Sequence, residues 1–149
     1  MSDFGEICPL FSTGLFNEIT FPNVSMTGIT ACGNALVGTL TCTKVGVFTF
    51  GRTVVVTAAY IRRNDTNETV MNMQLIHAVA NEVWNAGSQT IIGTCSITSD
   101  LTLYDIYTFK PFTITEKTFT SSDILGLNAV AGTAASSGVY DLIVRYREK

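Results

Sequence analysis

Hydrophobic and polar residues alternate along much of this chain, and the alternation is most regular near the C-terminus. Residues 139–147 place four large side chains on one side of the run, namely Tyr140, Leu142, Val144 and Tyr146. Most of the positions between them are charged. A period of two is typical of a β-strand with one face in a core and the other in water. The pattern therefore predicts a half-buried strand over residues 139–147.

Similar runs, with threonine as the usual outward residue, recur upstream and are separated by turn-forming residues about every 8–12 positions. The predicted strands are residues 36–43, 45–50, 52–62, 69–79, 89–98, 103–109, 112–119, 124–130 and 139–147. Short strands at this spacing predict an all-β fold, an antiparallel sandwich or barrel. Only residues 76–85 and 121–127 have a composition that would also permit one or two helical turns.

Residues 1–34 differ from the rest, because their apolar side chains follow neither the strand period nor the helix period. Glycine and proline interrupt this segment, yet it is too apolar to be a solvated tail. We expect an extended N-terminal arm over residues 1–34, followed by a β-sandwich domain over residues 35–149. The arm is expected to lie on its own domain or on a neighbouring molecule. Its candidate partner-binding residues are Phe4, Leu10, Phe11, Leu15 and Phe16.

The composition is unusual for a soluble domain in its shortage of charge. The chain has 149 residues, of which 46% are hydrophobic and 14% charged, against roughly 25% charged in ordinary domains. Either other subunits cover part of the exterior, or threonine and serine coat it, and the two explanations are compatible. The net charge is −3 and the basic residues are scattered. No basic stripe favours nucleic acid, and no polybasic run favours a membrane surface.

The four cysteines lack the paired spacing of a redox or zinc motif, and we expect buried free thiols at Cys8, Cys32, Cys42 and Cys95. A disulfide between Cys32 and Cys42 is the alternative. The N-terminus lacks the charged and apolar regions of a signal peptide, and no apolar run approaches the roughly 20 residues of a membrane span. These features predict synthesis in a cytoplasm.

Candidate chemistry is sparse. His77 is the single histidine, and its alternating run points it toward the apolar face, which favours a core or rim position over a catalytic one. No nucleophile elbow, metal-ligand spacing or phosphate-binding glycine loop is present. We expect no catalytic residue, no cofactor and no metal.

Three aromatic residues are candidates for stacking on a sugar ring. Trp84 lies beside Asn85 and Gly87 in a predicted loop, and Tyr104 and Tyr107 lie in an aromatic-rich run. The alternative for Trp84 is a cap on the open end of the sandwich.

The C-terminal part resembles small jelly-roll virion proteins of tailed bacteriophages, the head-decoration and head-fibre class. The residues that carry the resemblance are the turn and strand at 120–127, the small-residue loop at 131–138 and the closing strand at 139–147. The resemblance covers about 40% of the chain and implies a jelly-roll form of the sandwich. It also implies assembly, often as trimers that tie capsid subunits together, and it implies no catalytic residue.

From these patterns we predict an antiparallel β-sandwich of the jelly-roll type; an immunoglobulin-like strand order stays open. The predicted function is a non-enzymatic virion structural protein that decorates and stabilises an assembled phage head. Its expected partners are copies of itself, most plausibly in a trimer, and the major capsid protein or another virion protein. The alternative function is a carbohydrate-binding or receptor-binding module of a fibre.

Overall fold

The computed structural model describes residues 17–26, 30–31, 41–64, 71–80, 89–97, 109–131 and 138–149. These residues form eleven strands: β1 (Asn17–Met26), β2 (Thr30–Ala31), β3 (Thr41–Thr49), β4 (Val54–Arg63), β5 (Met71–Ala78), β6 (Thr90–Ile97), β7 (Lys110–Pro111), β8 (Thr113–Ile114), β9 (Lys117–Phe119), β10 (Ile124–Ala131) and β11 (Gly138–Glu148). Cys42 and Cys95 both fall within strands, as predicted.

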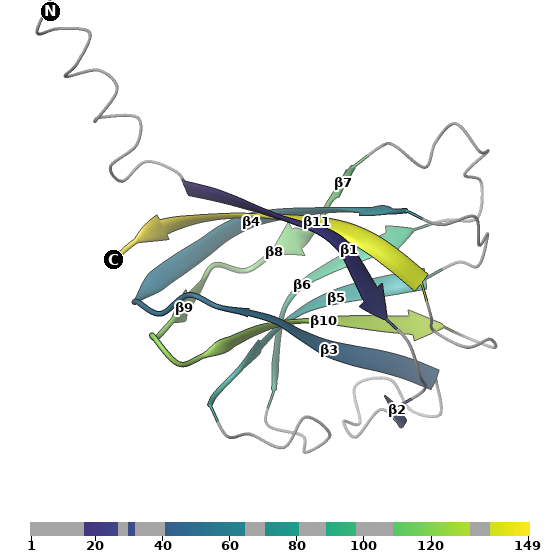
Figure 1. Cartoon of the computed structure of the whole chain (residues 1–149), viewed down its shortest axis with the longest axis horizontal. Helices are drawn as coiled ribbons and strands as arrows, with labels where there is room; N and C mark the ends of the chain where they lie inside the picture. Colours follow the sequence, from purple (N-terminus) through teal and green to yellow (C-terminus); the bar gives the residue numbers. More distant parts are fainter. Residues whose placement is uncertain are drawn as a thin grey trace, which may run out of the picture.

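The strands form two antiparallel sheets that pack against each other (Figure 1). Sheet A has the order β1-β11-β4-β7, and β9 also pairs with β4. Sheet B has the order β2-β3-β10-β5-β6-β8. The buried side chains of both sheets form one continuous hydrophobic cluster between them. The predicted antiparallel β-sandwich is therefore confirmed.

The jelly roll, the more specific prediction, stays a prediction. The strand order agrees with it, because β1-β11-β4-β7 opposes β3-β10-β5-β6. Strands that follow one another in the sequence mostly lie in opposite sheets, as they do in a fold built from two Greek keys.

Strand β11 lies between β1 and β4 in the middle of sheet A. The four residues predicted to face the core are buried, with relative exposures of 0% at Tyr140, Leu142 and Val144 and 6% at Tyr146. The predicted half-buried strand is confirmed. Figure 1 draws β11 in yellow, with the purple β1 and the blue β4 beside it.

Strand β1 lies inside the segment that the sequence assigned to an extended arm. Its residues pair with β11, but the register shifts between Phe21 and Val24. Asn23 occupies this bulge with a positive φ of 54°. Ile19, Phe21 and Val24 all pack against the core. Successive core-facing residues are therefore two positions apart before the bulge and three positions apart across it. Sheet A thus begins at Asn17, upstream of residue 35, where we placed the start of the sandwich domain.

Residues 109–119 cross between the sheets and do not form one continuous strand over residues 112–119. Strand β7 pairs with β4 in sheet A, β8 pairs with β6 in sheet B, and β9 returns to β4. Two backbone hydrogen bonds fix the crossing, from Phe112 N to Ala59 O at 2.9 Å and from Thr115 N to Ile92 O at 2.8 Å. This segment therefore joins the two sheets along one side of the sandwich.

Neither segment considered for a helix forms one where it is described. Residues 76–78 continue β5, and residues 121–122 form a turn before β10 begins. The described residues include no helix of the length and apolarity needed to cross a membrane.

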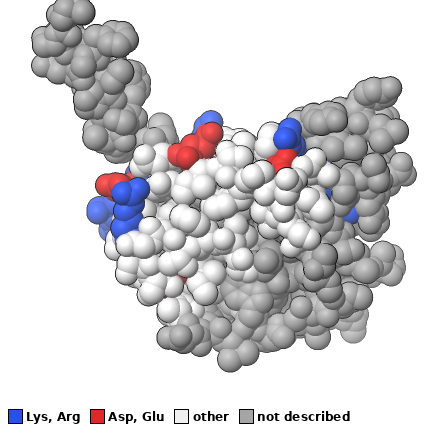
Figure 2. All heavy atoms as spheres, viewed as in Figure 1, with Lys and Arg blue, Asp and Glu red and all other residues white. Residues whose placement is uncertain are grey.

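Charged residues are distributed unequally between the sheets. Strands β5, β6, β8 and β10 contain no Asp, Glu, Lys or Arg, whereas β1, β4 and β11 carry half of the charged residues in the described ranges. Ion pairs on sheet A join Arg145 to Glu18 at 2.8 Å and Arg62 to Asp141 at 2.7 Å. On the face drawn in Figure 2, red and blue atoms lie beside one another in small groups, and the remaining described surface is uncharged.

Candidate functional site

Amide and hydroxyl side chains align across four neighbouring strands of sheet B. The register pairs Asn128 of β10 with Gln74 of β5, Gln74 with Thr94 of β6, and Thr94 with Thr113 of β8. Residues paired across neighbouring strands point to the same face of a sheet. Met73, next to Gln74, is fully buried in the core, so this aligned set faces outward. We call these four residues, Asn128, Gln74, Thr94 and Thr113, the polar ladder.

A second polar pair lies beside the ladder. Asn72 of β5 pairs with Ser96 of β6, and the Ser96 hydroxyl donates a hydrogen bond of 3.0 Å to Asn72 Oδ1. Both side chains are exposed. The outward face at this end of sheet B therefore offers amides and hydroxyls without a formal charge.

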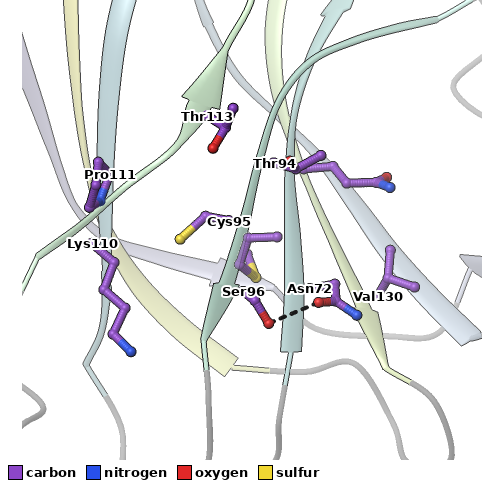
Figure 3. Close-up of a pocket in the computed structure, with 10 residues that line it drawn as sticks. Asn72, Thr94, Cys95, Ser96, Lys110, Pro111, Thr113 and Val130 are labelled. Atoms are coloured by element: carbon purple, nitrogen blue, oxygen red, sulfur yellow. Dashed lines mark hydrogen bonds between the residues drawn. The ribbon is translucent and has the colours of Figure 1, made fainter.

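The ladder borders a groove of about 580 Å³, a size within the range of small-ligand sites. The described residues that line it are Asn72, Met73, Gln74, Thr94, Cys95, Ser96, Lys110, Pro111, Thr113 and Val130. Figure 3 places Lys110 and Pro111 across the gap from β6, while the Cys95 and Thr94 side chains leave β6 in opposite directions. The groove thus includes Cys95 and Ser96, the part of β6 beyond its short pairing with β8.

Asn128 forms the buried end of the ladder. It is 2% exposed, and its Nδ2 donates a hydrogen bond of 2.6 Å to Gln74 Oε1. Its Oδ1 is buried and has no hydrogen-bond partner among the described residues. A buried polar atom without a partner costs about 1–3 kcal/mol. Asn128 therefore lies beneath the surface of sheet B, and the described lining of the groove does not include it.

Lys110 is the only charged residue among the described residues that line the groove. The structure gives it no carboxylate partner in the described part of the chain, and its side chain is half-buried. It lies close enough to the Cys95 thiol to affect its ionisation. Burial raises the pKa of Cys95, and the positive charge of Lys110 offsets part of that rise. Cys95 is a buried free thiol, as predicted for this cysteine.

His77 and Asp123 form a buried pair at the other end of β5. Their Nε2 and Oδ2 atoms lie 2.9 Å apart, and the side chains are 9% and 7% exposed. Asp123 Oδ2 also accepts a 2.8 Å hydrogen bond from the Thr120 backbone N–H, and the imidazole packs edge-on against the Phe119 ring. Burial raises the pKa of Asp123, but the hydrogen bonds from His77 and Thr120 outweigh it and the net shift is downward. These contacts tie β5 to the turn before β10, in agreement with a core histidine.

Asp141 organises a second buried cluster, on the outward face of sheet A. Its carboxylate accepts hydrogen bonds from Arg62 Nε at 2.7 Å, from the Asn23 backbone N–H at 2.9 Å and from Asn64 Nδ2 at 3.3 Å. Asn64 Nδ2 also donates to Asn23 Oδ1 at 2.8 Å. The cluster holds the bulge of β1 against β11 and β4. We assign it a structural role.

The site residues predicted from the sequence lie outside the described residues, and these predictions stay open. They are the arm residues Phe4, Leu10, Phe11, Leu15 and Phe16, and the stacking candidates Trp84, Tyr104 and Tyr107. Cys8, Cys32 and the Cys42 side chain are outside as well. Among the described residues, no three His, Cys, Asp or Glu side chains gather closely enough to hold a metal ion.

The polar ladder was missed in the sequence. A signal for it was present, because four consecutive or near-consecutive strands lack charged residues while retaining Asn, Gln, Thr and Ser at outward positions. The pairing that brings Asn128 beside Gln74 joins residues 54 positions apart. Alternation along single strands does not reveal such a pairing.

No protein-family model and no curated protein sequence matches the chain. Solved structures that are similar to it include the N-terminal CBM22-1–GH10 modules of Clostridium thermocellum endo-1,4-β-D-xylanase 10B with xylohexaose (TM-score 0.36, 7% identity, 90% of this chain and 26% of that chain). Others are the xylan-binding module CBM15 (TM-score 0.35, 13% identity, 91% and 99%) and a Cellvibrio japonicus xylanase 10C variant with xylopentaose (TM-score 0.29, 14% identity, 91% and 27%). The chain thus spans about a quarter of each xylanase structure. At these TM-scores the likenesses carry no conclusion about ligand or activity.

Proposed function

We propose that the chain is a non-catalytic module that binds carbohydrate along the polar ladder of sheet B. The observation that carries the proposal is the alignment of Asn128, Gln74, Thr94 and Thr113 in register across four strands. A carboxamide offers both a donor and an acceptor, and a hydroxyl offers both as well. Such groups match the vicinal hydroxyls of a sugar, which also donate and accept.

The dimensions of the ladder support the same ligand class. Neighbouring strands lie about 4.8 Å apart, so four strands span about 14 Å. Each step is comparable to the length of one pyranose unit, and an oligosaccharide lying across the strands would meet Gln74, Thr94 and Thr113, the three ladder residues that line the groove.

In this proposal the aromatic residues Trp84, Tyr104 and Tyr107 stack on sugar rings, and each can be tested separately. Residues 98–108, which include Tyr104 and Tyr107, join β6 to β7, and both strands line the groove. Trp84 belongs to the connection between β5 and β6 at their opposite ends. We therefore expect Tyr104→Ala or Tyr107→Ala to weaken binding more than Trp84→Ala.

A glycan array with purified protein tests the proposal, followed by calorimetric titration of any oligosaccharide that is retained. Gln74→Ala removes the central amide and should weaken binding about tenfold, since it deletes one or two hydrogen bonds. Thr20→Ala, an exposed polar change on β1 of sheet A, should bind like the wild type. Retention of no glycan, or equal affinity of the two variants, would refute carbohydrate binding at the ladder.

We keep the virion role as a second proposal, because β1 lies at the edge of sheet A among the described strands. The chain before Asn17 therefore joins the sandwich at a sheet edge, from which an arm could reach a neighbouring subunit or a capsid. In this proposal Phe4, Leu10, Phe11, Leu15 and Phe16 contact the shell, and copies of the chain associate, most plausibly as trimers.

Deletion of residues 1–16 tests the arm without removing any residue of β1. The truncated protein should keep its cooperative thermal unfolding but lose affinity for assembled phage heads in a co-sedimentation assay. Light scattering measures the oligomer in parallel. Undiminished binding to the heads would count against the arm, and a monomer at high concentration would count against the trimer.

A further inference from the structure

We propose that the groove selects acidic saccharides, with the Lys110 ammonium pairing with a carboxylate or sulfate of a sugar bound in the groove. This inference rests on the proposed carbohydrate function and adds the charge of the ligand. Its first support is position, since Lys110 lines the groove with Thr94, Ser96 and Thr113, and Figure 3 draws it on the β7 side of the gap.

The second support is the contrast between Lys110 and the arginines of sheet A. Arg62, Arg145 and Arg147 each lie within 3.4 Å of a carboxylate oxygen, and so are neutralised within the molecule. Lys110 has no carboxylate partner among the described residues, and strands β5, β6 and β8, which contribute to the same groove, contain no Asp, Glu, Lys or Arg. Among the described residues that line the groove, Lys110 is therefore the one positive charge, and no described carboxylate is paired with it.

The third support is partial burial. The half-buried Lys110 side chain extends from β7, whose backbone is fixed by pairing with Ile61 of β4. A lysine stem that lies along the protein surface loses less entropy when its ammonium binds an anion than a fully exposed stem does. Partial burial also reduces the screening of the charge by salt. An anionic group on the ligand gains more here than at an exposed surface lysine.

The ladder and Lys110 are expected to recognise different parts of an acidic sugar. The amides and hydroxyls of the ladder bind sugar hydroxyls whether or not the sugar is charged. Lys110 adds affinity only for an acidic sugar, and we expect a gain of about tenfold, between an exposed ion pair and a charge-assisted hydrogen bond. The gain should fall as the ionic strength rises.

Matched ligand pairs provide the test by calorimetric titration of the full chain. Tetragalacturonate is compared with its methyl ester, which keeps the hydroxyl pattern and removes the charge. A sulfated galactan tetrasaccharide is compared with its desulfated form, so that carboxylate and sulfate are distinguished. The acidic member of at least one pair should bind about tenfold more tightly than its neutral counterpart at low ionic strength.

Variants then assign the charge effect to one residue. Lys110→Gln should bind both members of a pair equally, and Lys110→Arg should retain the preference. Lys117→Gln is the matched control, because Lys117 is also half-buried and without a carboxylate partner among the described residues, but it lies on β9 and does not line the groove. The control should keep the wild-type preference, and thermal unfolding confirms that each variant folds.

The outcomes separate this inference from the proposed function. Equal binding of acidic and neutral saccharides by the wild type would overturn the role of Lys110 and leave carbohydrate binding intact. An equal loss in Lys110→Gln and Lys117→Gln would overturn it too, since the effect would then follow net charge. Failure of every saccharide to bind would overturn both proposals together.

Discussion

Replacing Asp141 with alanine should destabilise the protein by about 2–3 kcal/mol. The substitution leaves the Arg62 guanidinium, the Asn23 backbone N–H and the Asn64 amide without their shared acceptor. Removing one partner of a fully buried ion pair costs about 3–5 kcal/mol. The Arg62 side chain is 28% exposed, against 5% for Asp141, so water compensates part of that loss.

Urea unfolding measures this free energy, and calorimetry should record a fall in Tm of about 6–9 °C for a chain of this size. Hydrogen exchange adds a local readout, since the amides of β1 near the bulge should exchange faster once Asn23 has lost its contact with β11. Glu18→Ala is the matched control in the same sheet. It removes an ion pair whose side chains are both 45% exposed, and it should leave the unfolding free energy unchanged within error.

The pH dependence of the same variant provides a second check. Burial, the largest influence, raises the pKa of Asp141, but the hydrogen bonds from Asn23 and Arg62 outweigh it, and the pKa in the folded protein is lowered. The carboxylate therefore stabilises the fold fully above its unfolded pKa of about 3.9, and this contribution is lost as the pH falls through the folded pKa. The deficit of Asp141→Ala should shrink in acid. A deficit below about 0.5 kcal/mol at neutral pH, or one that grows in acid, would refute the reasoning.

Three further predictions concern the other end of the sandwich and the groove. Asp123→Asn should lower the free energy of unfolding at neutral pH by about 1–2 kcal/mol, because it weakens the contact with His77. Since the pKa of Asp123 is lowered in the folded protein, urea unfolding should find a smaller difference between variant and wild type in acid. A difference that does not change with pH would contradict a stabilising role of the ionised carboxylate. Gly93→Ala places a Cβ 2.8 Å from Ile114 Cγ1, so thermal unfolding should detect a loss of about 1–3 kcal/mol, whereas unchanged stability would mean that β8 yields freely. The reactivity of Cys95 can be measured in a variant whose other three cysteines are serine. Cys95 should react slowly with a thiol reagent until urea unfolds the chain, because burial raises its pKa and blocks access of the reagent. Equal reaction rates in the folded and unfolded states would contradict a buried thiol.

Alternation along single strands was sufficient to predict the fold class and the inward face of β11. It failed at β1, where the bulge at Asn23 changes the inward spacing and removes the period on which the prediction depends. It also failed over residues 112–119, because alternation describes one strand in one sheet, and here the chain changes sheets twice. Bulges and sheet changes are set by pairing with distant strands, and a local pattern carries no information about that pairing.

The candidate site was harder to predict for a related reason. Its polar residues look like ordinary outward positions when each strand is considered alone, and only the register of β10, β5, β6 and β8 brings them into one row. The buried state of Asn128 was equally hidden, since an asparagine between Leu127 and Ala129 is typical of an outward position. The sequence did contain the complementary signal, an absence of charge from these strands, but its value depends on knowing that the strands are neighbours.

The unequal distribution of charge between the sheets links stability to the proposed recognition. On the outward face of sheet A, Arg62 and Arg145 are already paired with Asp141 and Glu18, so these groups offer little to a ligand. Strands β5, β6, β8 and β10 of sheet B contain no Asp, Glu, Lys or Arg and therefore form no such pairs. A neutral hydroxyl-rich ligand can hydrogen-bond to that face without breaking any ion pair, whereas a protein partner rich in charge would have to bury its charges against amides, at a cost of several kcal/mol for each ion. Among the described faces, sheet B is therefore the one on which binding a sugar costs least, and Lys110 at its border is the group through which the charge of that sugar would be distinguished.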